Sequence, residues 1–423
     1  MSRTSSTRLL IAGLTVTTVV AAVITVRTTD SRPRDRVVRV SQALPVEMSQ
    51  PLVQFAAVAM TDADVADSDI DFYSRRITRD PRSTLDRVAL AALLLTRART
   101  TGSTADFERA ESLARESITI SERRNGRAFE ILASALMSRH AFREARAVAA
   151  RADSVEPSTA SHLALLGEIE LELGDYDSAA HHFTAVRYDG RQFTVGARLA
   201  RWYEVTGRAD IARTLMKRSI IGVDRRDDLP REQVAWFHYR LGELELRTGR
   251  LDAAGNAFQR SLARNPDDVR ALGGLTRLAI ARREWRQAIT FGERATSVQL
   301  DPTTLGAVTH AYAALGDSAQ ASRYASAMSV SALTQPGSIH RAWGLHLLDH
   351  GTLAERAEVL RRAQAEIEER ADVYGHDLLA WALFRAGRLD EAQREMQLAL
   401  SQRTEDVQLT AHARAIDSAL AAR

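Results

Sequence analysis

Two histidines four positions apart, His346 and His350, are the first residues whose type and spacing could support chemistry. On a helix they would share one face, with Asp349 beside them, and such a pair can bind zinc. The segment HLLDH lacks the Glu that acts as general base in the H-E-x-x-H zinc motif, and no third ligand is near in sequence. His181 and His182 are neighbours that point about 100° apart on a helix. We therefore predict no metal site.

Other signatures of catalysis are missing from the sequence. There is no G-x-S-x-G nucleophile motif, no Gly-Lys-Ser/Thr phosphate-binding loop and no dinucleotide-binding fingerprint. The carboxylate pairs at residues 227–228 and 267–268 could do acid–base work. They lie, however, at expected junctions between helices, where negative charge stabilises the N-terminus of the next helix. We therefore predict that the protein is not an enzyme and needs no cofactor.

The composition favours helices and excludes several classes of site. Of the 423 residues 45% are hydrophobic, 26% are charged and only nine are prolines, which is typical of an all-α protein. The absence of cysteine excludes disulfides, thiolate metal sites and a cysteine nucleophile. Arginines make up all but one of the 57 basic residues, the exception being Lys217, and 54 acidic residues leave a net charge of +3. This balance gives no reason to expect a nucleic-acid partner.

A charge-free segment, residues 9–26, follows the basic N-terminus and is bounded by Arg8 and Arg27. At about 1.5 Å per residue it spans roughly 27 Å, close to the hydrocarbon thickness of a bilayer. We interpret residues 1–27 as a signal anchor with one transmembrane helix. A cleavable signal peptide is the alternative, because residues 20–22 (VAA) offer small side chains for cleavage, although the apolar run continues beyond them.

Two opposing signals bear on the side of the membrane that carries the rest of the chain. Five arginines between residues 27 and 39 follow the span, which by the positive-inside rule would retain the body in the cytoplasm. A basic N-terminus that leads directly into an apolar run is the usual export signal of a bacterial anchor. We predict a single-pass protein of the bacterial inner (cell) membrane with an extracytoplasmic, periplasmic body, joined to the anchor by a linker at residues 28–69.

Glycines recur at a nearly constant interval within helical patterns. They are Gly174, Gly207, Gly249, Gly316, Gly351 and Gly387. Their separations are 33, 42, 67, 35 and 36 residues. The longest separation is two periods, with Arg283 at the missing turn, and the polar insertion GVDRRDDLP at residues 222–230 lengthens the second. The period of about 34 residues indicates a repeated helix pair.

Residue types repeat with the same period. The segments LLGEIELELGDYDSAAHHF and RLGELELRTGRLDAAGNAF carry the same Leu-Gly, Ala and Phe positions, which are Gly167, Ala179 and Phe183 in the first segment. This pattern resembles the tetratricopeptide repeat, W-x2-L-G-x2-Y, then A-x3-F, then P. In such a hairpin the small residues allow the two helices to cross closely, and the Phe fills the space against the next hairpin.

The resemblance implies an all-α protein: a right-handed α-solenoid of about nine hairpins over residues 70–406, with a capping helix at residues 407–423. A polar cap of this kind keeps the end of a solenoid soluble. The residue pattern is weakest in the first, seventh and eighth hairpins. The expected hairpins lie at 84–122, 126–157, 160–192, 193–226, 235–268, 269–301, 302–335, 337–370 and 373–406.

The resemblance also implies where a partner would bind. In similar proteins the first helix of each hairpin lines an inner groove, and its second, fifth, ninth and twelfth positions contact a bound peptide. Here these positions are rich in aromatic residues and arginine, which dominate binding hot spots. The implied partner-binding residues are Arg201, Trp236, Tyr239, Arg270, Arg277, His310, Arg341, Tyr374, Trp381 and Phe384. Glu243 and Asp377 occupy equivalent positions, and the Lys and Asn that clamp a peptide carboxylate in some relatives are absent.

We therefore predict a membrane-anchored scaffold that binds a partner protein or peptide in its groove, in the assembly or biogenesis of an envelope complex. Two alternatives stay open. One is a structural module that forms a homo-oligomer, with the groove occupied by a helix of a neighbouring copy. The other is an enzyme without a recognised motif. The sequence does not identify the partner.

Overall fold

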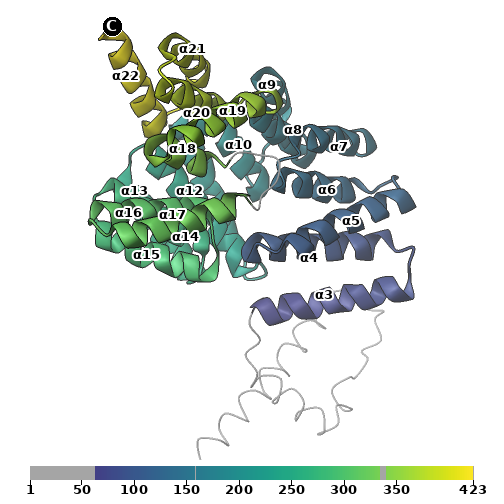
Figure 1. Ribbon diagram of the computed structural model, residues 1–423. Helices are drawn as coiled ribbons and strands as arrows, with labels where there is room; N and C mark the ends of the chain where they lie inside the picture. Colours follow the sequence, from purple (N-terminus) through teal and green to yellow (C-terminus); the bar gives the residue numbers. More distant parts are fainter. Residues whose placement is uncertain (1–61, 158, 334–339, 423) are drawn as a thin grey trace, which may run out of the picture. The chain divides into compact units, whose positions relative to one another are not determined.

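The computed structural model describes residues 62–157, 159–333 and 340–422, and every regular element in them is an α-helix (Figure 1). The prediction of an all-α repeat array is confirmed for this part of the chain. The helices are α3 (Asp62–Arg79), α4 (Thr84–Thr101), α5 (Thr104–Ile120), α6 (Gly126–Ser138), α7 (Phe142–Val155), α8 (Ala160–Leu173), α9 (Tyr176–Ala185), α10 (Phe193–Val205), α11 (Ala209–Val223), α12 (Arg231–Arg247), α13 (Leu251–Arg264), α14 (Val269–Ala281), α15 (Trp285–Val298), α16 (Pro302–Ala314), α17 (Ser318–Leu333), α18 (Arg341–His350), α19 (Leu353–Glu369), α20 (Val373–Arg385), α21 (Leu389–Ala399) and α22 (Val407–Ala421).

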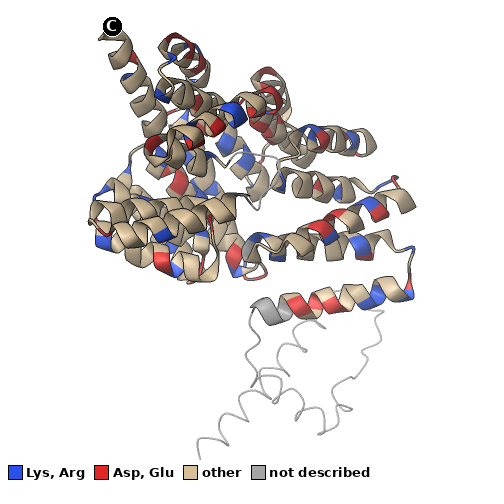
Figure 2. Ribbon diagram, viewed as in Figure 1, with Lys and Arg blue, Asp and Glu red and all other residues tan. Residues whose placement is uncertain are grey.

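Helices α4 to α21 pack in sequence as nine hairpins, α4 with α5 through α20 with α21. Helix α3 packs against α4 before the first hairpin, and α22 packs against α20 and α21 after the last. The first helix that the structure describes, α3, begins at Asp62. Basic and acidic residues are interspersed along these helices, as Figure 2 shows.

The turns inside the hairpins explain the periodic glycines. A left-handed backbone, with φ between +67° and +79°, is adopted by Gly174, Gly207, Gly249, Gly316 and Gly387. Arg283 adopts the same conformation at the turn that lacks a glycine, with φ of 60°. Gly351 differs, because its φ of −75° is accessible to any residue. The period was thus set by turn geometry, which glycine satisfies without steric cost.

Several acidic residues stabilise helix N-termini as expected. The carboxylate of Asp268 accepts a hydrogen bond from the Arg270 amide at the start of α14. Asp372 accepts one from the Gly375 amide at the start of α20. The other predicted pair behaves differently: Asp228 lies in the loop before α12 and pairs with Arg226. Capping therefore accounts for one of the two carboxylate pairs.

Small residues and phenylalanines hold neighbouring helices together. The ring of Phe183 packs on Gly167 and stacks on Trp202 of the next hairpin, with ring centroids 5.3 Å apart. In the same way Phe258, fully buried, packs against Gly242 and Gly274. The predicted packing of Phe against the next hairpin is confirmed in both repeats.

The close contact at Gly242 gives a testable prediction. A Cβ at this position would lie 2.5 Å from the ring of Phe258, which has no free space to move because its side chain is fully buried. We expect Gly242→Ala to destabilise the protein by about 1–3 kcal/mol through overpacking. Gly222→Ala in α11 is the matched control, because no atom lies within 4 Å of the new Cβ.

For the control, helix propensity alone predicts a gain of up to about 1 kcal/mol. Urea denaturation of the two variants, followed by circular dichroism, would measure both effects. Equal changes in the two variants would show that the contact with Phe258 does not restrict this position.

Among the described residues no helix is long and apolar enough to cross a membrane. The predicted transmembrane segment, residues 9–26, and the linker up to residue 61 lie outside the described residues.

Candidate functional site

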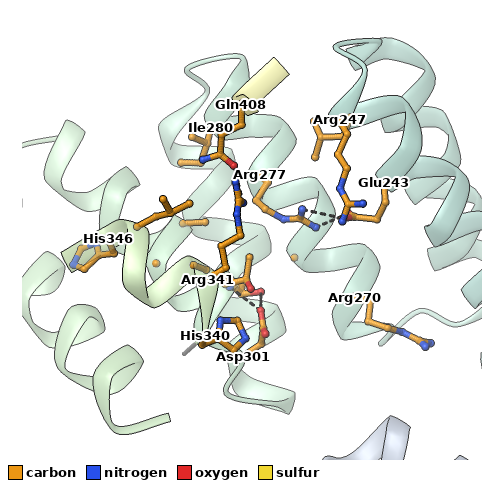
Figure 3. Close-up of a pocket in the computed structure, with 18 of the residues that line it drawn as sticks. Glu243, Arg247, Arg270, Arg277, Ile280, Asp301, His340, Arg341, His346 and Gln408 are labelled. Atoms are coloured by element: carbon orange, nitrogen blue, oxygen red, sulfur yellow. Dashed lines mark hydrogen bonds and ion pairs between the residues drawn. The ribbon is translucent and has the colours of Figure 1, made fainter. Parts of the chain in front are cut away.

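A cavity of about 930 Å³ lies on the inner side of the array. Its lining comes mainly from the first helices of successive hairpins: α10, α12, α14, α16, α18 and α20, with Arg99 from the end of α4 and Gln408 from α22. Figure 3 shows part of this lining. The first helices of these six hairpins therefore face one cavity, as the resemblance implied.

The structure brings seven of the ten predicted partner-binding residues together around this cavity. They are Arg201, Tyr239, Arg270, Arg277, His310, Arg341 and Tyr374. Glu243, at an equivalent position, also lines the cavity, whereas Asp377 is fully buried behind it. The repeat register thus placed most of the predicted residues at one cavity.

The other three predicted residues lie outside this cavity. Trp236 packs edge-on against Phe237, with centroids 4.9 Å apart, and joins the core between α10 and α12. Trp381 stacks on His412 of α22 at 4.2 Å and on Phe384 at 4.8 Å. Helix α22 lies on the side of α20 where the sequence predicted an open groove, so the ring of Trp381 contacts the C-terminal helix.

Buried carboxylates hold the cavity arginines in place. Glu204 accepts from Arg247 at 2.8 Å and lies 3.3 Å from Arg240 and 3.4 Å from Arg201. Glu243 accepts two hydrogen bonds from Arg277, at 2.5 and 3.1 Å, and Arg247 also points at it (Figure 3). Paired N–H donors on one carboxylate give a strong and directional contact.

These carboxylates stay ionised at neutral pH. Burial raises the pKa of Glu204, but the charges of Arg201 and Arg247 outweigh it and lower the pKa to about 2. Burial likewise raises the pKa of Glu243, and the Arg277 charge outweighs it and holds that pKa below its usual range. The cavity wall therefore carries fixed charges of both signs.

Tyr374 of α20 is surrounded by arginines. The guanidinium groups of Arg201, Arg247 and Arg341 lie 5.6, 5.5 and 5.3 Å from the centre of its ring. Each is within the range of a cation–π interaction. Arg201 and Arg247 belong to the fourth and fifth hairpins, and Tyr374 belongs to the ninth. Tyr374, which the sequence predicted as a partner contact, therefore already packs against arginines of the fourth and fifth hairpins.

The ninth hairpin reaches this position because its flanking segments dock on the turns of the third and fourth hairpins. The Ala371 amide donates to the Leu173 carbonyl at 3.3 Å, and Arg370 pairs with Glu172 at 2.9 Å. Further along, the Thr404 hydroxyl donates to the Val205 carbonyl at 2.5 Å. We name residues 370–373 and 403–407 the docking segments. The docking segments close one side of the cavity. The repeat period of the sequence does not predict these contacts.

The histidine pair considered for zinc lies at one end of the cavity. The rings of His346 and His350 are 5.2 Å apart, and His310 lines the same cavity. Burial lowers the pKa of His310 and of His346, and nearby His350 adds to the lowering in both. Among the described residues, no group of three or more His, Asp or Glu side chains is arranged to hold a metal ion.

Comparisons with known proteins agree with the repeat pattern. The family model described as tetratricopeptide repeat matches residues 237–268, which span most of α12 and α13. A search of curated proteins found no match.

The chain is also similar to several solved structures. One is PilW, described as a widely conserved type IV pilus biogenesis factor, with 17% identity over 49% of this chain and 94% of that one, and a TM-score of 0.41. Another is Pseudomonas aeruginosa pilF, with 17% identity over 57% of this chain and 97% of that one, and a TM-score of 0.40. A third is human IFIT1, with 13% identity over 75% and 72%, and a TM-score of 0.49. The part of the chain that the structure describes is an all-α helical-repeat array, and its residues 237–268 match the tetratricopeptide repeat model.

Proposed function

We propose that the protein is a scaffold that binds a segment of a partner protein in the inner cavity. The observation that carries this proposal is the lining itself, because the first helices of six hairpins present side chains to one cavity of about 930 Å³. A cavity of this size accepts a short stretch of residues, comparable to pockets of roughly 300–1,000 Å³ that hold small ligands. Binding needs no covalent chemistry.

In this proposal residues 9–26 anchor the scaffold in the bacterial inner membrane, with the repeats on the extracytoplasmic side and a role in assembling an envelope complex. Support comes from the uncharged run of residues between Arg8 and Arg27, which is long enough to cross a bilayer. Protease added outside intact spheroplasts should digest the repeats. Digestion only after lysis would place them in the cytoplasm.

Photo-crosslinking from inside the cavity tests the proposed binding. Ala307 of α16 lines the cavity, and Ser322 of α17 is exposed on the outer helix of the same hairpin. We expect a benzoylphenylalanine at position 307 of the full chain to crosslink a partner segment in the cells that make the protein. The same group at position 322 serves as the matched control.

The identity of the adduct decides between the alternatives. A partner protein joined from position 307 and not from position 322 supports the scaffold. A second copy of this chain would favour the self-associating module. Equal adducts from both positions, or none from position 307, would reject binding in the cavity.

A further inference from the structure

We infer that the inner cavity takes an acidic segment, a short run of Asp or Glu side chains. This inference rests on the proposed function and names the chemistry of the partner. The first observation is the composition of the lining, which holds seven arginines and no lysine against four carboxylates. The arginines are Arg99, Arg201, Arg247, Arg270, Arg277, Arg341 and Arg370.

The second observation is which member of three ion pairs at the cavity is more exposed to solvent. The side chains of Glu204, Glu243 and Asp377 are 7, 3 and 0% exposed. Their arginine partners Arg247, Arg277 and Arg341 are each 29% exposed. The carboxylates are therefore buried behind the guanidinium groups, and the accessible surface at these pairs is cationic.

The third observation is an arginine without a partner. Arg99 lines the cavity at the end of α4, and no hydrogen bond or ion pair joins it to another residue that the structure describes. The side chain of Arg99 is exposed, and the positive charges of Arg198 and Arg270 are among those that act on it. An anionic group bound here would relieve this repulsion.

The geometry favours carboxylates over nucleic acid as the anion. Bases bind single-strand sites largely by stacking on free aromatic rings. Both tyrosines of the lining already have arginines over their rings: Arg270 lies over Tyr239, and three arginines surround Tyr374. A guanidinium instead matches a carboxylate with two parallel hydrogen bonds, which Arg277 already makes to Glu243. A further carboxylate would meet the same kind of donor.

Peptide binding to the full chain tests this inference. We expect fluorescently labelled hexaglutamate to bind at least about tenfold more tightly than hexaglutamine, because each charge-assisted hydrogen bond stabilises the complex appreciably. The difference should shrink with added salt. Arg99→Gln should weaken hexaglutamate binding about tenfold while circular dichroism stays unchanged. Arg260→Gln is the matched control, since Arg260 is exposed on α13 and lies outside the lining, and it should bind like the parent.

Three results would overturn the inference. These are equal binding of hexaglutamate and hexaglutamine, unchanged hexaglutamate binding by Arg99→Gln, and tighter binding of an oligodeoxythymidine than of hexaglutamate. The last would identify a nucleic-acid site. Failure here is separable from failure of the proposed function, because a crosslinked partner segment without acidic residues at position 307 would retain the scaffold and reject the acidic ligand. Hexaglutamate binding that depends on Arg99, without any partner adduct, would retain the acidic ligand and reject the scaffold.

Discussion

Glu204→Gln is expected to lower the free energy of unfolding by about 3 kcal/mol, because the loss of one buried carboxylate leaves several guanidinium charges uncompensated. Arg201, Arg240 and Arg247 all point at Glu204, whose side chain is only 7% exposed. Gln retains the size of the side chain but not its charge, so the change isolates the electrostatic contribution. Urea denaturation of the variant and the parent at pH 7 measures it.

The same carboxylate predicts how stability depends on pH. The pKa of Glu204 is about 2 in the folded protein, below its value of about 4.3 in an unfolded chain. A lowered folded pKa stabilises the protein above the unfolded value, and this stabilisation is lost as the pH falls from about 4 towards 2. The difference between parent and Glu204→Gln should therefore shrink over that range.

A surface ion pair provides the matched control. Glu391 pairs with Arg388 at the start of α21 and is 40% exposed. Glu391→Gln makes the same chemical change, and we expect stability to stay close to that of the parent because exposed pairs contribute little. If Glu204→Gln were as stable as the control at pH 7, the buried arginines would be compensated by something other than Glu204.

The repeat pattern allowed the fold to be predicted because each hairpin is specified locally. The turn glycines, the Phe that packs on the next hairpin and the acidic caps all act within one repeat or between neighbours. The register then identified seven residues of the cavity lining. It even contained a signal for one buried pair: Glu243 and Arg277 lie 34 residues apart, one period, at inner positions of adjacent hairpins.

The docking segments and the packing of α22 could not be predicted in this way. The Thr404 hydroxyl and the Val205 carbonyl are 199 residues apart, a separation that no nearest-neighbour rule constrains. The same holds for the contacts of Tyr374 with Arg201 and Arg247, which belong to the fourth and fifth hairpins. Trp381 is of a residue type that is common in binding hot spots. Only the structure shows that its ring stacks on His412 of α22. Because distant segments pack together, Tyr374 and Trp381 make contacts within the chain instead of lining an open groove.

Gly174→Ala should release the first docking segment, and the effect can be separated from turn strain. A Cβ at Gly174 would lie 2.1 Å from the Ala371 carbonyl oxygen and 2.4 Å from its carbonyl carbon, so the backbone must move away. This movement would break two hydrogen bonds, from the Ala371 amide to the Leu173 carbonyl and from the Val373 amide to the Tyr176 hydroxyl. We expect hydrogen exchange at Ala371 and Val373 to accelerate by at least about tenfold.

Gly387→Ala is the control that makes this test specific to docking. Gly387 has φ of +76°, almost the same as the +77° of Gly174, but no atom lies within 4 Å of its built Cβ. Both variants therefore bear the cost of a left-handed alanine, about 1–2 kcal/mol. Only Gly174→Ala also displaces a neighbouring backbone. Similar exchange at Ala371 in both variants would mean that the turn strain alone, and not the contact with the ninth hairpin, determines how firmly the cavity is closed.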